Sequence, residues 1–341
     1  MTINNQRPGV YSSYTLTSGY GAPRSQMAAV VIAAGAAANA GELFEFSGYQ
    51  SAVDMLEAEG NSKILECIRI LFVSGVSKVF ACVVDESYTN AFALIKNVDN
   101  IGAVVCDAAE AADLEALRVL MAECTADMRE KIAFVGADTA EKAANDAKRL
   151  NSERMVVCCP AAQTAYSENG ESVFSAAAMA GRVLAESDLA YNWNGERMNV
   201  LTDCAVLGEA EIQALISAGV TVLENRGGVC CIRAITTKTV EGGAADNSMR
   251  PINTVLIIDR VMTSLRQSLK ARLAGAMLSY ESIASQITVI LLEAMEDGLI
   301  ESFDTPVIHA SAADSSVCVA ELGFKIAHVV SQIHISAHIS V

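Results

Sequence analysis

Five short apolar runs, separated by stretches with helical character, are the feature that most constrains the fold of this chain. The runs are rich in Val, Ile, Phe and Cys, and they lie at residues 28–33, 78–84, 101–107, 131–136 and 154–160. They show no alternation of polar and apolar residues, which indicates strands that are buried on both faces. Buried strands that alternate with helices are typical of a parallel sheet. We therefore predict a doubly wound α/β layer that extends to about residue 200.

Acidic residues follow three of these runs, at Asp85, Asp107 and Asp138. In open α/β sheets ligands bind beyond the carboxyl ends of the strands, so an α/β enzyme with an acidic metal or phosphate site here is one hypothesis. An Asp just ahead of a helix is, however, more often the N-cap of that helix. The chain also has no GxGxxG, GxxxxGK(S/T), GxSxG or HExxH motif. We expect no catalytic residues, no cofactor and no bound metal.

Composition and charge exclude several other classes of protein. Apolar residues make up 52% of the chain, yet no apolar run approaches the ~20 residues of a membrane helix, so we expect no membrane insertion. The N-terminus lacks the layout of a secretory signal, and the ten cysteines lie mostly in apolar runs; both features fit a protein made in the reducing cytoplasm. With 24 basic and 40 acidic residues the net charge is −16, which argues against nucleic-acid binding.

The second half of the chain changes in character. A hairpin is predicted between 220–225 and 229–237, because Gly227 and Gly228 separate two β-rich runs. A long helix follows from about 254 to 277, and a second helix at about 282–297 ends at Gly298. Five basic residues and one acidic residue between positions 250 and 280 give this stretch a local charge of +4. A basic helix in an acidic protein points to an acidic partner.

The last residues of the chain have the pattern of an amphipathic strand. Apolar side chains alternate with His334, Ser336, His338 and Ser340. An unpaired strand edge invites association with another chain. The histidines, with His328 ahead of them, have a spacing that suits a metal, but a solvated polar face explains them better.

A set of motifs in this order resembles the tail sheath proteins of contractile phages, most closely the short sheaths of Gram-positive prophages and of phage-tail-like bacteriocins. The motifs are "PGVY" (8–11), "AMAGRV" (178–183), the segment 199–228, "IRAITT" (232–237), "INTVLIIDRVMTSLRQSLK" (252–270) and the alternating terminal strand. They cover the N-terminal arm and the chain from about residue 175, whereas 40–170 shows only a compatible α/β pattern. Arg233 stands where the family commonly keeps an Arg, although the usual wording there is "WGARTL".

The resemblance implies an outer doubly wound α/β domain (26–199) inserted into an α+β inner sheath domain (200–322). Extended β arms at 1–25 and 323–341 would leave their own subunit and add strands to sheets of neighbouring subunits, which is β-augmentation. The residues that would make this inter-subunit strand exchange are Val10, Tyr11, Tyr14, Leu16, Ile333, Ile335, Ala337, Ile339 and Val341.

The same resemblance implies a structural subunit that stacks as hexameric rings around a tail tube and contracts from a metastable extended state. Its partners would be further copies of itself, the tail tube protein, and the baseplate and tail terminator proteins, in a virion or a phage-tail-like particle. Arg266, Lys270 and Arg272 would face the tube. Two alternatives stay open, the α/β enzyme and a different structural protein such as a tail terminator or shell component.

Overall fold

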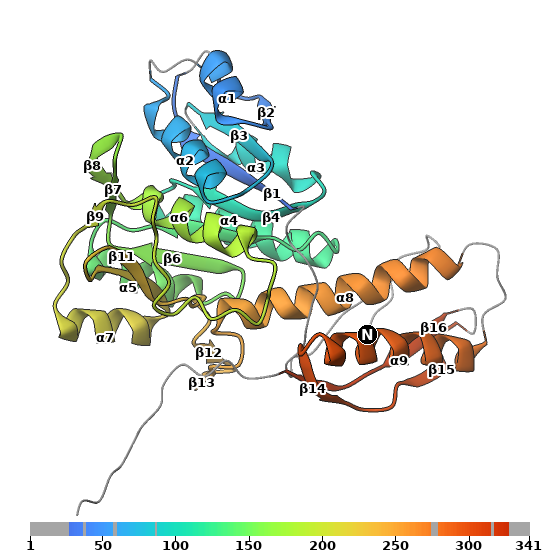
Figure 1. Ribbon diagram of the computed structural model, residues 1–341. Coiled ribbons are helices and arrows are strands. Elements are labelled where there is room, and N and C mark those ends of the chain that lie inside the picture. Colours follow the sequence, from blue (N-terminus) through green and yellow to red (C-terminus); the bar gives the residue numbers. More distant parts are fainter. Residues whose placement is uncertain are drawn as a thin grey trace, which may run out of the picture.

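An eight-stranded sheet forms the centre of the computed structural model, which describes residues 27–36, 39–56, 60–85, 87–273, 279–314 and 317–326 (Figure 1). Its strand order is β11-β10-β6-β5-β4-β1-β3-β2. The strands are β1 (Ala28–Ala34), β2 (Leu43–Phe46), β3 (Val79–Val84), β4 (Ile101–Cys106), β5 (Ile132–Gly136), β6 (Met155–Cys159), β10 (Val220–Asn225) and β11 (Val229–Arg233). The five predicted strands β1, β3, β4, β5 and β6 all form and run parallel, which confirms the predicted α/β layer.

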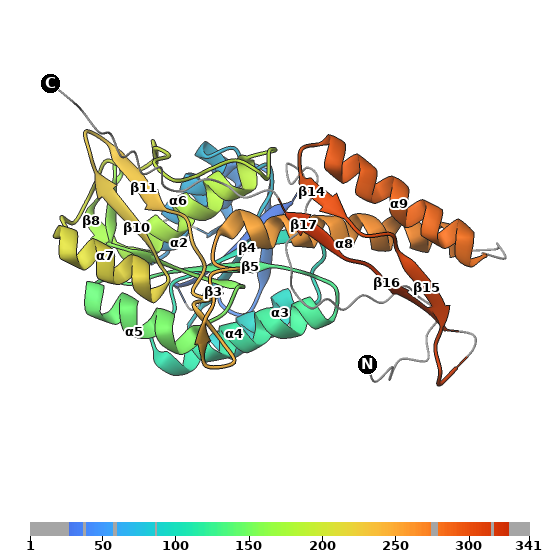
Figure 2. The same cartoon turned by 90° about the horizontal axis from the view of Figure 1, so that it is seen from below.

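Helices cover both faces of this sheet (Figures 1 and 2). Alternate residues of β1 enter two separate cores, with Val31 on one face and Val30 and Ile32 on the other. On the Val31 face lie α1 (Tyr49–Leu56), α2 (Ser62–Val73) and α6 (Ser172–Ala185). The opposite face carries α3 (Tyr88–Lys96), α4 (Ala111–Ala126), α5 (Ala140–Leu150) and α7 (Glu209–Ala218). The sheet is therefore doubly wound, as the continuous apolar strands predicted.

Small residues allow α6 to lie very close to its neighbours. Ala176, Ala177 and Ala178 are fully buried on this helix. A Cβ added at Gly181 would lie 2.7 Å from the Cβ of Ser74, just after α2, and one added at Gly136 of β5 would overlap the carbonyl oxygen of Ser172. The "AMAGRV" motif thus has a packing role, because only small side chains permit this approach.

The sheet continues past residue 199, where the sequence placed the boundary between the outer and inner parts. β10 pairs in parallel with β6, and β11 returns antiparallel to β10. The predicted hairpin is therefore confirmed, but it completes the large sheet because its apolar side chains Val220, Val222 and Leu223 are needed in the two cores. Residues 195–198 cover the outer edge of β11, where the Cys231 N–H donates to the Glu196 carbonyl at 2.8 Å.

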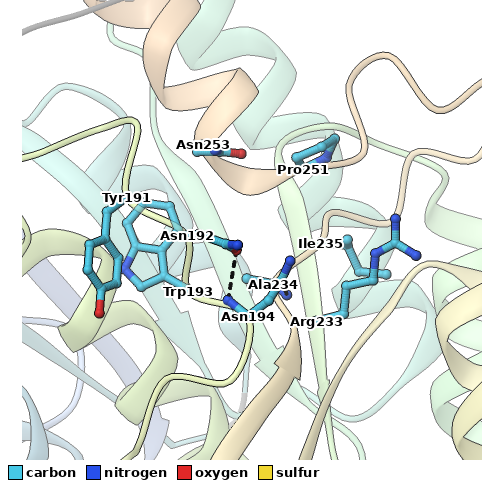
Figure 3. A pocket seen from close by; sticks show the side chains of 9 residues that line it. All are labelled: Tyr191, Asn192, Trp193, Asn194, Arg233, Ala234, Ile235, Pro251 and Asn253. Carbon is cyan, nitrogen blue, oxygen red and sulfur yellow. Dashed lines mark hydrogen bonds between the residues drawn. The ribbon is translucent and has the colours of Figure 1, made fainter. Parts of the chain in front are cut away.

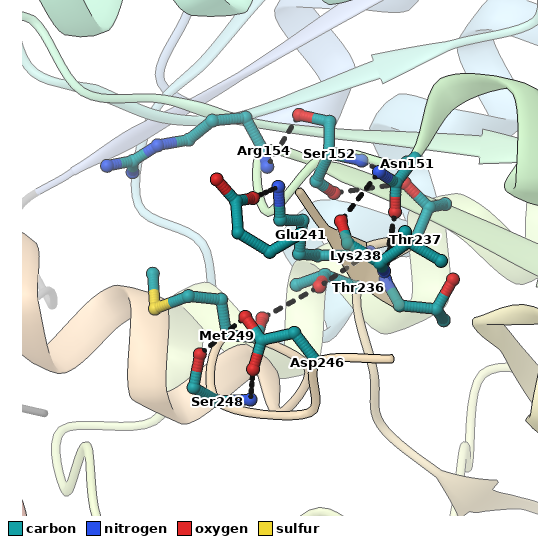
Figure 4. Close-up of polar contacts among 12 residues, drawn as sticks. Asn151, Ser152, Arg154, Thr236, Thr237, Lys238, Glu241, Asp246, Ser248 and Met249 are labelled. Atoms are coloured by element: carbon teal, nitrogen blue, oxygen red, sulfur yellow. Dashed lines mark hydrogen bonds and ion pairs between the residues drawn. The ribbon is translucent and has the colours of Figure 1, made fainter. Parts of the chain in front are cut away.

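A polar network fixes the chain where it leaves β11 (Figure 4). Asn151 ends α5 in the left-handed region at φ 37°, and its side chain donates to the Val240 carbonyl at 2.9 Å and accepts from the Thr239 N–H at 3.0 Å. The Thr237 hydroxyl accepts from the Ser152 N–H and donates to the Ser152 carbonyl, both at 2.9 Å. The path toward the next helix is thus set by the loop ahead of β6, together with the small ribbon of β12 (Val240–Glu241) and β13 (Ala244–Ala245).

Two long helices and an interrupted hairpin follow. α8 (Ile252–Leu273) begins on the body of the molecule and extends away from it to α9 (Tyr280–Glu296), as Figures 1 and 2 show. Beyond α9 come β14 (Ile300–Phe303), β15 (Val307–Ala310), β16 (Cys318–Glu321) and β17 (Phe324–Ile326). Both predicted helices are confirmed, and Gly298 follows α9 at φ 69°. β7 (Ala162–Thr164), β8 (Ser167–Glu171) and β9 (Asp203–Cys204) form a separate small sheet.

Candidate assembly surfaces

A buried ion pair fixes α8 to the sheet. The Arg154 guanidinium, at the start of β6, donates to both carboxylate oxygens of Asp259 at 2.6 and 2.7 Å, and the two side chains are 2% and 8% exposed. Fork-like pairing of this kind fixes direction as well as distance. Neither residue was among the predicted site residues, although an Asp inside the apolar run "LIIDRV" is a visible signal, since buried carboxylates need a partner.

Arg266, expected to face a tube, makes a second ion pair within the chain. Its guanidinium contacts both carboxylate oxygens of Glu130, at 2.7 and 2.8 Å, and it also donates to the Thr263 hydroxyl at 2.9 Å. The residue is buried, with 9% of its surface exposed. Lys270, one turn further along α8, is exposed. Arg272 lies in α8, but its side chain is outside the described part of the structure; among the described cations of α8, Lys270 is exposed and Arg260 is half-buried.

The strands after α9 form one long hairpin that is interrupted in the middle. β14 pairs with β17, and β15 pairs with β16 inside them. At the interruption the Asp304 N–H donates to the Gly323 carbonyl at 2.8 Å, and a Cβ added at Gly323 would lie 2.5 Å from an Asp304 carboxylate oxygen. Within the described residues each ribbon has only two strands, so its outer edges have no strand partner. Such edges accept an added strand readily.

The predicted strand-exchange residues all lie outside the described residues. Positions 10, 11, 14 and 16 fall in the segment 1–26, and positions 333 to 341 fall in the segment 327–341. The expected C-terminal arm began at residue 323, yet β17 at Phe324–Ile326 pairs with β14 of the same chain. Ile326 enters the core that α8 and α9 share, which is why this part of the expected arm stays with its own subunit.

The outer surface of α9 combines apolar and acidic side chains. Val289, Leu292 and Met295 are exposed on it, beside Glu293 and Glu296. From Ser279 to Ile326 the sequence holds eight acidic residues and one basic residue. A solvated helix rarely exposes three large apolar side chains together unless the surface meets another chain.

The three strand-end acids do not form a common site. Asp85 and Asp138 are exposed, and the N-caps of the helices that follow them are Ser87 and Thr139, whose hydroxyls accept the capping hydrogen bonds. Asp107 instead joins the ends of β1 and β4. Within the described residues no cluster of three or more His, Cys, Asp or Glu side chains is placed to hold a metal ion.

Asp107 acts as a structural link. Its carboxylate accepts from the Ala34 N–H at 3.1 Å and from the Tyr88 hydroxyl at 2.7 Å, and the Lys63 ammonium lies 3.5 Å away. Burial, and then the charge of Asp107, raise the pKa of Tyr88. Burial opposes the charge of Lys63, but Asp107 and Glu171 raise its pKa. This network thus ties together the ends of β1 and β4 and the start of α3.

A small pocket lies between three segments of the chain (Figure 3). Its volume is about 30 Å³, close to the share of one water molecule, so a substrate-sized ligand does not fit. The residues around it are Tyr191, Asn192, Trp193, Asn194, Arg233, Ala234, Ile235, Pro251 and Asn253. Of the four histidines, only His309 on β15 lies in the described part of the chain.

Comparisons with known proteins show which known fold this architecture resembles. No family model matches the sequence, and no curated protein is similar to it in sequence. The structure, in contrast, is similar over almost its whole length to the helical sheath of the anti-feeding prophage in its contracted state. The TM-score is 0.71 at 12% identity, with 98% of this chain and 99% of that chain covered. The chain has the tail-sheath fold.

Two sheath tail proteins of Gram-positive bacteria have the same fold. The protein from Desulfitobacterium hafniense has a TM-score of 0.68 at 9% identity, over 94% of this chain and all of that one. The protein from Listeria innocua has a TM-score of 0.68 at 11% identity, over 91% of this chain and 96% of that one. The predicted resemblance to sheath proteins is confirmed at the level of the fold. In the described part of the chain, no helix combines the length and the apolar character needed to cross a membrane.

Proposed function

We propose that this chain is the structural subunit of a contractile tail sheath. The observation that carries the proposal is the extent of the structural match: 98% of the chain aligns with 99% of a helical sheath protein. An enzyme built on the same sheet would need a ligand site at the strand ends. In the described structure the Asp107 carboxylate at these strand ends already accepts hydrogen bonds from the Ala34 N–H and the Tyr88 hydroxyl.

Strand exchange between subunits would join the copies. The segment 327–341 alternates apolar and polar residues, and the β14–β17 and β15–β16 ribbons offer outer edges for an added strand. Residues 1–26 carry Arg7 and Arg24 and no Asp or Glu, which complements the strongly acidic stretch from Ser279 to Ile326, while 327–341 carries no Asp, Glu, Lys or Arg. The residues from Val10 to Leu16 and from Ile333 to Val341 are the proposed donors.

The tube contact belongs to the same proposal. Lys270 and Arg272, near the end of α8, are the proposed tube-facing cations, while Arg266 holds α8 in position through Glu130. Exposed ion pairs contribute only ~0 to 1 kcal/mol each, so many of them hold a register and still release together. Association with a baseplate follows from the similarity to a chain of the anti-feeding prophage baseplate, with a TM-score of 0.70.

Contraction would move whole subunits against one another. The buried pairs of Arg154 with Asp259 and of Arg266 with Glu130 join α8 to the sheet, so body and helix would move together. A metastable extended state then needs two packings of the same interfaces, with a barrier between them. The division into an outer and an inner part is proposed with one change: both parts share the eight-stranded sheet.

Electron microscopy of two chains in negative stain tests the proposal. The first is the full-length protein, and the second ends at Ile326, which keeps every described element. Tubes or stacked rings from the full-length protein alone support a sheath joined by donated strands. If both chains give the same small particles, the proposal is wrong. If both give tubes, the protein is a sheath subunit whose contacts do not use residues 327–341.

A further inference from the structure

Arg233 is the one motif residue to which the sheath proposal assigns no role, and the structure places it in an unusual setting. It is the last residue of β11 and lines the small pocket shown in Figure 3. The pocket is lined by residues 191–194, by the chain just after β11, and by Pro251 and Asn253 at the start of α8. Three of the lining residues are asparagines, Asn192, Asn194 and Asn253.

Arg233 is half-buried, and within the described residues its guanidinium has no hydrogen-bond or ion-pair partner. Its charged neighbour is another cation, Arg250, whose pKa is lowered by burial and by the charge of Arg233. Arg250 already donates to the Ile216 carbonyl and to the Asn247 amide oxygen. Two half-buried guanidinium groups of like charge are unfavourable unless an anion lies beside them.

The surroundings favour an anion in two further ways. The first turn of α8 starts at Ile252, so the positive end of a 22-residue helix faces the pocket region. The frame is also rigid, because the Asn194 side chain accepts from the Ala234 N–H at 3.0 Å and the Asn192 side chain accepts from the Asn194 N–H at 3.1 Å. A volume of about 30 Å³ suits a single small group such as a carboxylate.

We propose that Arg233, with Arg250 nearby, binds a carboxylate side chain of a second copy of this chain. The terminal segments 1–26 and 327–341 contain no Asp or Glu, so neither can supply a side-chain carboxylate from within the subunit. A neighbouring copy carries 40 acidic residues against 24 basic ones and is rich in suitable side chains. The inference rests on the proposed self-assembly of the subunit, and it adds an ionic contact that does not depend on strand exchange.

The first test compares three full-length variants for the protein concentration at which they begin to sediment as assemblies. Arg233→Gln keeps the side chain polar and of similar reach but removes its charge. Arg226→Gln is the matched control, because Arg226 is an exposed arginine on the same hairpin, paired with Glu224 at 2.5 Å. Arg233→Lys keeps the charge without the fork geometry. Thermal unfolding below the assembly concentration shows whether each variant is still folded as before.

We expect Arg233→Gln to raise the assembly concentration about tenfold with an unchanged unfolding temperature, and Arg226→Gln to change it less than about twofold. Arg233→Lys should fall in between. Equal assembly of Arg233→Gln and the unaltered protein overturns the inference and leaves the sheath proposal intact. A lower unfolding temperature for Arg233→Gln alone assigns Arg233 a role inside the subunit and also overturns it. If the unaltered protein does not assemble, both proposals fail.

Chemical cross-linking then identifies where the carboxylate comes from. Assemblies of Arg233→Lys are prepared from mixed light and heavy nitrogen-labelled copies and treated with a carbodiimide, which joins an amine to a carboxylate in direct contact. We expect a cross-link from residue 233 to an acidic peptide that pairs light with heavy copies. Cross-links only within one copy, or none at residue 233 while other lysines react, contradict the proposal.

Discussion

A buried ion pair between two residues that are far apart in the sequence fixes the position of α8. Arg154 and Asp259 are 105 positions apart, and both are almost fully buried. We expect Asp259→Ala to lower the free energy of unfolding by about 3 to 5 kcal/mol, because it leaves a buried guanidinium without its carboxylate. Urea unfolding followed by circular dichroism measures this change.

The control for that variant is the exposed pair of Arg226 with Glu224. Arg226→Gln should change the free energy of unfolding by less than about 1 kcal/mol, since exposed ion pairs contribute little. Equal losses in the free energy of unfolding of the two variants would mean that burial does not make the pair of Arg154 and Asp259 more stabilising than an exposed pair.

A single methyl group tests how closely α6 packs on the sheet. Gly136→Ala places a Cβ against the main chain of Ser172, which cannot move without shifting α6, whereas Gly48→Ala places its Cβ in open space. We expect Gly136→Ala to destabilise the fold by about 1 to 3 kcal/mol and Gly48→Ala to leave it almost unchanged. Thermal denaturation of both variants compares them, and similar midpoints would contradict the close approach.

The cysteines give a pH prediction. Nine of the ten are buried, and Cys318 is exposed. Burial raises the pKa of Cys204 to about 11 and that of Cys231 to about 12, from an ordinary value of 9.0. Above pH 9 the unfolded chain therefore loses thiol protons that the folded chain retains, so the free energy of unfolding should fall as the pH rises further. Urea unfolding at several pH values between about 8 and about 10.5, a range around the ordinary thiol pKa, measures how steeply the free energy of unfolding falls with pH.

A thiol reagent provides the complementary readout. In the native protein we expect one fast-reacting thiol per chain, lost in Cys318→Ser, and nine that react only on unfolding. Several fast thiols in the native state would show that the two cores open more easily than their burial indicates.

At the scale of elements, the interrupted hairpin predicts different stabilities for two truncated chains whose ends lie close together in the sequence. A chain that ends at Ile326 keeps β17 on β14, whereas a chain that ends at Gly323 loses β17 and exposes the apolar surface that Ile326 covers. We expect the longer truncation product to unfold at the same temperature as the full-length protein below its assembly concentration. The shorter one should unfold earlier, in proportion to the lost apolar burial. Differential scanning calorimetry compares the three chains, and equal midpoints would show that β17 does not support α9.

The elements themselves were largely predictable, because each has a local pattern. Continuous apolar runs predicted the five parallel strands, and the long helix predicted at about 254–277 corresponds to α8, on which Ile258, Val261 and Leu265 are buried. The partner of the β10–β11 hairpin was not predictable, since its two-glycine turn says nothing about which strand lies beside it. The same limit applies to Arg266: its position near an apolar stripe suits either solvent or Glu130, which lies 136 positions away. The strand-exchange residues stay a prediction.

At the scale of the whole molecule, assembly and stability are linked. Subunits that exchange strands are stabilised by one another, so the unfolding temperature of the full-length protein should rise with protein concentration. The chain that ends at Ile326 should show a weaker dependence, because it keeps only the contacts that do not use the terminal segment. Calorimetry over about a hundredfold range of concentration tests this, and equal slopes for the two chains would mean that the terminal segment does not join subunits.

The strand order of the sheet also determines how late in synthesis the sheet can be completed. β1 is the third strand from the β2 edge of the sheet, and β10 and β11 complete the opposite edge only after about two hundred further residues have been made, on the order of ten seconds or more at ~5–20 residues per second. The hairpin edges and the segment from 327 onward leave the ribosome later still. The acceptor edges and the C-terminal donor segment thus emerge only when the body that carries them is able to fold, whereas the N-terminal donors Val10 to Leu16 emerge first. The late emergence of the acceptor edges limits premature strand exchange between neighbouring nascent chains on one messenger.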